Sequence, residues 1–271
     1  MPSRNAGIWI LAVLALAVTV AALALPPLPQ PPEYHQFADQ RALLGIPSFF
    51  NVFSNVAFLL VGSAGVVLGL RNRSPHASQS LLDPSIRWTY LVMFAAVALT
   101  CVGSAYYHLA PDNTRLTWDR LPMSVGFMAL LAAMISERIH PRAGMALLGP
   151  LVLVGIASVL YWHWGEAAGT GNLRPYVAVQ SFAVLAVLLI IFLFPPRHSR
   201  GTDILTAVAW YALAKGAEFY DREIYSAGQI IGGHALKHLF AALAIFWILR
   251  MLWKRRPVTD SPSPRSLSAS S

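Results

Sequence analysis

Three histidines, an aspartate and a serine are the side chains of this sequence best suited to hydrolytic chemistry. Ser104 and His108 lie four residues apart in the stretch CVGSAYYHLAPDNTRLTWDRLPM, so on a helix they share one face. Asp119 follows eleven positions later, where the next apolar run begins. His234 and His238, again four apart, open the last apolar run. Ionisable groups inside apolar segments are costly and are therefore functional candidates.

This set of side chains predicts zinc chemistry. Catalytic zinc takes three protein ligands and keeps one position for water, and the three histidines could supply those ligands. Zinc makes a bound water a nucleophile near neutral pH. Asp119 is placed to take its proton, and Ser104 to hydrogen-bond the oxyanion of a tetrahedral intermediate. The alternative is that these polar groups tie helix ends together, with Asp119 as a helix N-cap.

The composition indicates a polytopic membrane protein. The chain has 271 residues, of which 56% are hydrophobic and 12% are charged, whereas soluble domains carry about 25% charged residues. Cys101 is the one cysteine, so the chain can form no internal disulfide, and a zinc site must use histidine and carboxylate ligands. We therefore expect an all-α bundle of membrane helices.

Eight apolar runs are long enough to cross a bilayer, which takes about 17–25 residues. The first is either an uncleaved anchor helix or a cleaved signal segment. The predicted organisation is an N-terminal anchor or signal segment (1–28), an extended Pro-rich extracytoplasmic linker (29–48), a helical core (49–253) and a disordered cytoplasmic tail (254–271). The eight runs are 8–26, 49–70, 88–109, 119–137, 144–164, 176–195, 203–221 and 229–253.

The distribution of positive charge predicts the orientation. With a cytoplasmic N-terminus, thirteen of the 20 Lys and Arg residues fall on the cytoplasmic side and five outside. The net charge of +8 is thus mostly a topology signal, and no nucleic-acid partner is expected. This orientation brings all five candidate residues to the outer interface, where Trp162 and Trp164 suit an aromatic belt. The outer positive residues are Arg41, Arg115, Arg120, Arg174 and Arg222.

Further polar residues lie within the predicted helices. Asn51, Ser54 and Asn55 could hydrogen-bond the second nitrogen of a metal-binding histidine, or could hold helices together as Ser and Asn do in membranes. Glu218 could do the same, but pairing with Lys215, three residues earlier, is favoured.

The motifs resemble one protein family. G-S-x-x-x-H at 103–108, D-x-L-P-M at 119–123 and H-x-x-x-H at 234–238 are similar to the alkaline ceramidase family. That family belongs to a wider set of seven-helix membrane hydrolases, which includes the adiponectin-receptor-like proteins. N-V-F-S-N at 51–55 resembles the family's Asn-x-x-Ser-Asn near the start of its first core helix, and the similarity spans 49–253.

The resemblance implies a zinc-dependent hydrolase. His108, His234 and His238 would bind zinc, while Ser104 and Asp119 would assist hydrolysis of the amide bond of ceramide or a similar N-acyl lipid. The products would be a sphingoid base and a fatty acid. The fold would be a seven-helix ceramidase-like core plus one extra N-terminal transmembrane helix.

Calcium binding is not expected. Eukaryotic members of the family carry an acidic, calcium-binding stretch that ends in Glu just before Phe-aromatic-Asn. In this chain Ser48 occupies that position, and Glu33 and Asp39 are the nearby acids. Calcium takes about six to eight oxygen ligands, more than these residues offer.

Two functions of other classes compete with the hydrolase. One is a receptor-like or scaffold membrane protein with a structural zinc site, for which a fourth protein ligand or a collapsed cavity would argue. The other is a transporter that uses these groups as a proton relay, which ranks last because the inner half of the bundle offers few ionisable groups. The sequence carries no signal for an oligomeric state.

Overall fold

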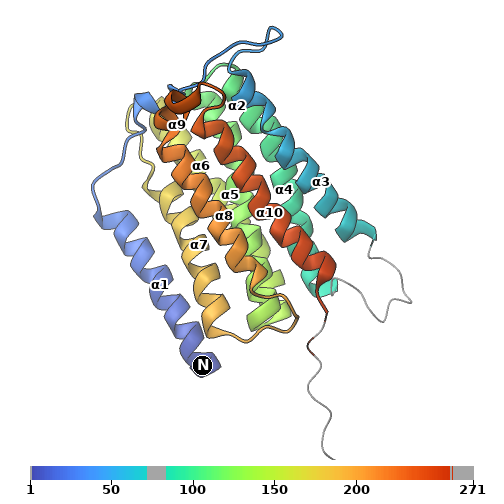
Figure 1. The fold of residues 1–271 in the computed structure, drawn as a ribbon. Coiled ribbons are helices and arrows are strands. Elements are labelled where there is room, and N and C mark those ends of the chain that lie inside the picture. Colours follow the sequence, from blue (N-terminus) through green and yellow to red (C-terminus); the bar gives the residue numbers. More distant parts are fainter. Residues whose placement is uncertain (1, 72–83, 257, 259–271) are drawn as a thin grey trace, which may run out of the picture.

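The apolar runs predicted as membrane spans form the helices of one bundle (Figure 1). The computed structural model describes residues 2–71, 84–256 and 258. Most of the predicted C-terminal tail therefore lies outside the described residues. The helices are α1 (Arg4–Ala24), α2 (Phe49–Phe53), α3 (Val56–Arg71), α4 (Pro84–Leu109), α5 (Asn113–Met134), α6 (Pro141–Ala167), α7 (Arg174–Leu193), α8 (Asp203–Phe219), α9 (Asp221–Gly228) and α10 (Gly233–Lys254).

The helix lengths confirm an all-α polytopic membrane bundle. Within the described ranges, seven helical segments are long and apolar enough to span a membrane, and α2 with α3 count as one of them. The α8 helix, with 17 residues, completes the bundle. The extra helix α1 lies at the edge beside α7 (Figure 1), and Arg4 Nη2 donates to the Ile139 carbonyl at 2.8 Å.

The predicted run 49–70 is broken rather than continuous. Its two helices, α2 and α3, meet at Ser54 and Asn55. Both side chains donate to the Asn51 carbonyl, Ser54 Oγ at 3.2 Å and Asn55 Nδ2 at 2.7 Å. Such side-chain bonds compete with the backbone pattern of a helix, so they account for the break.

The crossing of α4 and α5 depends on a glycine and a proline. Pro122 has no N–H group, so the Trp118 carbonyl, four residues earlier in α5, lacks its usual helical donor. A Cβ atom on Gly103 would come within 2.0 Å of that carbonyl oxygen. Only glycine therefore allows this approach of α4 to α5, which places Ser104 beside Asp119.

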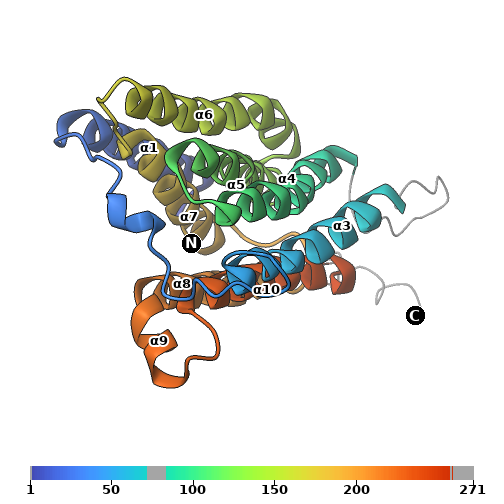
Figure 2. The same cartoon turned by 90° about the horizontal axis from the view of Figure 1, so that it is seen from above.

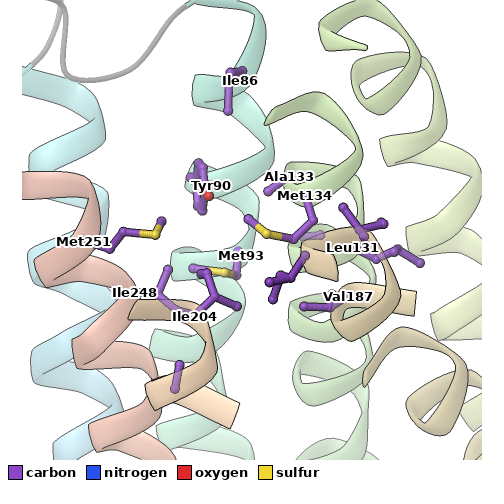
Figure 3. Packing of buried hydrophobic residues seen from close by; sticks show 14 of the residues in the cluster. Ile86, Tyr90, Met93, Leu131, Ala133, Met134, Val187, Ile204, Ile248 and Met251 are labelled. Atoms are coloured by element: carbon purple, nitrogen blue, oxygen red, sulfur yellow. The ribbon is translucent and has the colours of Figure 1, made fainter. Parts of the chain in front are cut away.

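A hydrophobic core fills the half of the bundle remote from the candidate residues (Figure 3). Met93 from α4, Met134 from α5 and Met251 from α10 are each at most 2% exposed. Methionine adapts its shape to irregular gaps between helices. The candidate polar residues lie at the other end of the bundle, where α4 ends and α5 and α10 begin.

The linker between α1 and α2 crosses that second end of the bundle (Figure 2). It contains one 3₁₀ turn, Pro32–His35, and its Phe37 is 6% exposed. The expectation of an extended segment was therefore incomplete, because aromatic side chains of the linker are buried against the helices.

Candidate metal centre and active site

The three candidate histidines meet at one point. His108 lies in the last turn of α4, and His234 and His238 lie in the first two turns of α10. One ring nitrogen from each lies within 4.8 Å of the others. Their exposed fractions are 0%, 5% and 3%, so the cluster is buried within the protein.

The hydrogen bonding of the histidine rings fits a metal site. Both ring nitrogens of His108 and Nε2 of His234 are buried and have no hydrogen-bond partner among the described residues. Buried polar atoms are seldom left unpaired. His238 Nδ1 lies 2.8 Å from Ser54 Oγ, which leaves Nε2 for a metal. Histidines that bind a metal usually form such a hydrogen bond through their other ring nitrogen.

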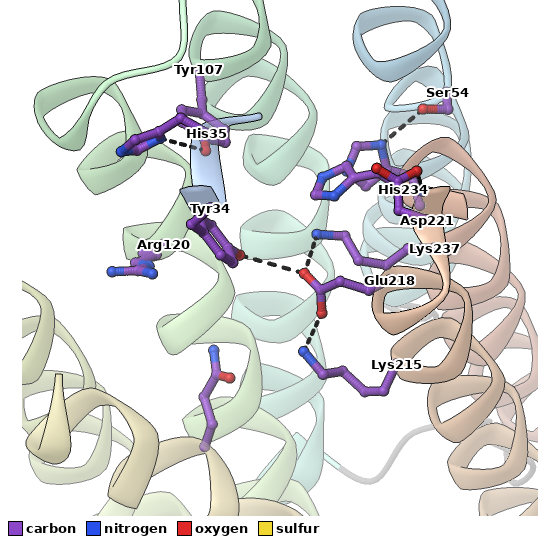
Figure 4. Close-up of polar contacts among 12 residues, drawn as sticks. Tyr34, His35, Ser54, Tyr107, Arg120, Lys215, Glu218, Asp221, His234 and Lys237 are labelled. Carbon is purple, nitrogen blue, oxygen red and sulfur yellow. Dashed lines mark hydrogen bonds and ion pairs between the residues drawn. The ribbon is translucent and has the colours of Figure 1, made fainter. Parts of the chain in front are cut away.

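Two local features fix the start of α10. A Cβ atom on Gly233 would lie 2.1 Å from the Ala217 carbonyl, so glycine lets α10 pack tightly on α8. The Asp221 carboxylate accepts from the backbone N–H of His234 at 2.8 Å and from that of Ala38 at 2.9 Å (Figure 4). Asp221 therefore ties the linker to the first turn of the histidine helix.

Ser104 and Asp119 face each other at the α4–α5 crossing. They are 1% and 7% exposed, and both side chains line the same cavity. Helix α5 begins at Asn113, six residues before the predicted start, because Asp112 accepts from Arg115 N–H at 2.7 Å as its N-cap. Asp119 thus lies inside the helix, and the alternative that it caps α5 is wrong.

The other predicted polar residues have varied contacts. Asn51 Nδ2 donates to the Asp39 carbonyl at 3.2 Å, and Asn55 bonds Asn51; neither of these bonds involves a histidine ring. Glu218 forms the expected ion pair with Lys215 and a second, at 2.8 Å, with Lys237 (Figure 4). Glu218 is therefore held by lysines, while the Ser54 hydroxyl lies 2.8 Å from a ring nitrogen of His238.

The linker covers the histidine cluster, and this contact was not predicted from the sequence. The Phe37 ring centroid lies 4.6 Å from that of His108 and 4.3 Å from that of His234. His35 bonds the Tyr107 hydroxyl at 2.9 Å, and Tyr34 bonds Glu218 at 3.4 Å (Figure 4). The aromatic residues of the linker, Tyr34 and Phe37, could have indicated this burial, because aromatic side chains are unusual in a segment surrounded by water.

Two residues expected at the membrane interface are buried instead. Trp162 is 0% exposed and Arg120 is 5% exposed, and the guanidinium carbon lies 4.2 Å from the Trp162 ring centroid. Helix α6 continues to Ala167, past the predicted end at 164, and Trp162 lies within this helix.

A cavity of about 710 Å³ adjoins the candidate site residues. Its walls include His238, Ser104 and Asp119, and it continues along apolar side chains toward Ile204 and Ile248. The cavity therefore joins the histidine cluster to a space suited to acyl chains.

Asp39, one of the two acidic residues of the linker, is already paired with an arginine. Asp39 accepts from Arg41 Nε at 2.9 Å and from Arg41 Nη2 at 2.7 Å. Burial raises the pKa of Asp39, but the hydrogen bonds and charge of Arg41 outweigh burial and hold that pKa below its usual value. A calcium ion would have to displace the arginine.

We expect calcium to leave the stability of the protein nearly unchanged. The melting temperature should shift by less than about 2 °C at millimolar calcium, since about 1 kcal/mol of ligand stabilisation moves it by roughly 2–4 °C at this size. Thermal unfolding in detergent, with magnesium as the matched control, measures this. A larger shift that Asp39→Asn removes would overturn the expectation.

The sequence model of the ceramidase family matches residues 44–215, which is more than half of the chain. The chain belongs to the ceramidase family. The match includes Ser104, His108 and Asp119, while His234 and His238 lie beyond it and join them only in the folded structure. A search of curated proteins found no match.

Membership of the ceramidase family supports a membrane enzyme that hydrolyses ceramide. The helices of this ceramidase-family protein agree with an integral multi-pass membrane protein. Its three buried histidines could hold a metal ion.

Proposed function

We propose that this ceramidase-family protein is a zinc-dependent hydrolase of the amide bond in ceramide or a similar N-acyl lipid. The products are a sphingoid base and a fatty acid. The observation that carries the proposal is the buried histidine cluster beside a lipid-sized cavity lined by Ser104 and Asp119.

The three histidines hold the metal in this proposal. His108, His234 and His238 each present a nitrogen to one point, and Ser54 fixes the orientation of the His238 ring. Zinc held there supplies Lewis acidity to a water molecule and to the amide carbonyl. The rest of the chemistry belongs to side chains of the protein.

Asp119 moves the proton. Its carboxylate accepts a proton as the water oxygen bonds to the amide carbon, and then donates that proton to the nitrogen as the carbon–nitrogen bond breaks. Ser104, on the wall of the same cavity as Asp119, donates a hydrogen bond to the carbonyl oxygen as negative charge develops there. The buried site lowers the local dielectric constant, which strengthens both interactions.

Metal analysis combined with a lipid assay tests the proposal. Purified protein should contain about one zinc per chain, as a three-histidine site requires, and should release fatty acid from a fluorescent N-acyl sphingoid lipid. Removing zinc with a chelator should stop the release, and adding zinc back should restore it. Stoichiometric zinc without turnover of any N-acyl lipid would favour the scaffold alternative.

The membrane orientation is part of the proposal. We propose an anchor helix in 1–28, a linker in 29–48, a hydrolase core in 49–253 and a cytoplasmic tail in 254–271. Both termini are cytoplasmic, and the histidines lie near the outer interface. The excess of positive residues on the cytoplasmic side supports this orientation, and the lipid enters sideways between helices.

Ser104→Ala should keep zinc and slow turnover by about 10²-fold or more, because one oxyanion donor contributes about that much. Thr100→Ala is the matched control: Thr100 lies one turn earlier on α4, lines the same cavity and donates to the Ala96 carbonyl at 3.0 Å. Steady-state kinetics with zinc content measures both. Equal rates for the two variants would remove Ser104 from the mechanism.

A further inference from the structure

Arg120 is a buried cation that the proposed hydrolysis does not use. It follows Asp119 on α5 and is 5% exposed. Its Nη2 donates to Gln30 Oε1 at 2.6 Å. Its Nη1 is buried with no hydrogen-bond partner among the described residues. Within that part of the chain no carboxylate forms an ion pair with it.

Aromatic rings hold the Arg120 side chain in place. Its guanidinium carbon lies 4.2 Å from the ring centroid of Trp162, 4.8 Å from that of Tyr176 and 5.6 Å from that of Tyr34, and Tyr34 lies beside it in Figure 4. Cation–π contacts stabilise a guanidinium but occupy none of its N–H donors. The fork is therefore fixed in position with hydrogen-bonding capacity to spare.

Other buried arginines of this protein are fully engaged. Arg255 pairs with Glu137. Arg138 donates to the carbonyls of Ile191, Phe194 and Gly201 at 3.0–3.3 Å. A buried charge without such partners is costly. Arg120 differs from both arginines because its Nη1 has no partner among the described residues, and an anionic ligand would supply one.

The spare donors of Arg120 belong to the wall of the large cavity. Arg120, Gln30, Tyr34 and Tyr176 line the same cavity as Asp119. Its ionisable walls carry three cationic and two anionic side chains, counting histidine as neutral, so they have one positive charge in excess. The cationic residues are Arg120, Lys215 and Lys237, and the anionic residues are Asp119 and Glu218.

We propose that Arg120 is an oxyanion-binding subsite that holds a carboxylate or phosphate group on the polar end of an acyl lipid. Arginine matches these groups because its planar fork donates two parallel hydrogen bonds. The acyl chain lies along the apolar part of the cavity. Resting on the proposed hydrolysis, the oxyanion comes from one of two sources: an anionic head group on the amine side of the lipid amide, or the carboxylate of the released fatty acid.

Two matched pairs of probes test the subsite by direct binding. Dodecanoate is compared with 1-dodecanol, and N-dodecanoylglycine with N-dodecanoylethanolamine, by calorimetric titration of the full-length protein in neutral detergent at a pH that ionises both acids. The wild type should bind the anionic member of at least one pair about tenfold or more tightly, the range of a charge-assisted hydrogen bond. A preference only in the first pair identifies the released acid, and a preference in the second identifies the head group.

Variants assign the preference to Arg120. In Arg120→Gln the affinities for the two members of a pair should differ by no more than about twofold, because the charge-assisted hydrogen bond is lost. Arg115→Gln is the matched control and should keep the preference. Arg115 lies on the same helix and stacks on Tyr106 at 4.8 Å, but it pairs with Asp112 and does not line the cavity.

Equal affinity of the wild type for both members of both pairs would overturn the proposal, and this comparison needs no variant that might misfold. A preference that Arg120→Gln retains in folded protein would overturn it as well. Because binding and hydrolysis are measured in separate experiments, the subsite would stand if the chain bound the anionic probes but hydrolysed no N-acyl lipid. In that case only the proposed hydrolysis would fail.

Discussion

Replacing His234 with alanine is expected to remove both zinc and hydrolysis. The remaining pair, His108 and His238, would leave zinc one protein ligand short of a catalytic site. The affinity for zinc should fall by more than the roughly 10–100-fold that is lost when a residue hydrogen-bonded to a metal ligand is removed. Loss of metal catalysis, worth several kcal/mol, should lower turnover by at least about 10³-fold. Elemental analysis and lipid turnover measure the two effects.

His163→Ala is the control for that experiment. His163 lies on α6 and bonds the Thr117 hydroxyl at 2.9 Å, outside the histidine cluster, so this variant should keep its zinc. Circular dichroism and gel filtration check that both variants fold. Full zinc content and full activity in a folded His234→Ala protein would end the metal-site interpretation.

Asp119→Asn should keep most of the zinc and lose about 10²–10⁴-fold in turnover, the usual contribution of a positioned acid–base group. Asparagine preserves the shape of the side chain but cannot carry the proton from water to the amine. Single-turnover kinetics and metal analysis on the same preparation separate the two effects.

The control for Asp119 lies on the same helix. Asp112→Asn makes the same chemical change at the N-cap of α5, where asparagine caps as well as aspartate, so its turnover should stay near that of the wild type. Loss of zinc in Asp119→Asn would make the aspartate a metal ligand and favour a closed, structural site. No change in either property would contradict the proposed mechanism.

The position of the histidines could be predicted from the sequence. Spacing of four residues placed His234 and His238 on one face, and the direction of successive membrane helices placed His108 at the same end. Both rules are local or topological, and the structure brings these three side chains together. Their role as zinc ligands remains a prediction.

The cover formed by the linker could not be predicted in the same way. Phe37 lies in a Pro-rich segment with no helical or strand periodicity, which is the signal that identifies a buried face. Its burial against His108 and His234 depends on contacts between parts of the chain distant in sequence.

The environment of Arg120 was missed for a different reason. Charge counting treats every arginine near a segment end as solvated, and the predicted start at Asp119 left Arg120 at the interface. Asp112 starts α5 earlier, which turns Arg120 into an interior residue. A capping signal eight residues upstream of Arg120 thus decides whether this cation faces water or the cavity.

The cover of Phe37 over the histidines has a kinetic consequence. Phe37 is 6% exposed and packs over His108 and His234, so in the proposed orientation we expect a lipid to reach the cavity from within the bilayer. The relevant concentration is then an amount per membrane area. At constant total substrate, adding inert lipid to the vesicles should lower the rate in proportion to the mole fraction of substrate. Diluting the same proteoliposomes in buffer should leave turnover per enzyme unchanged, and the opposite pattern would indicate entry from water.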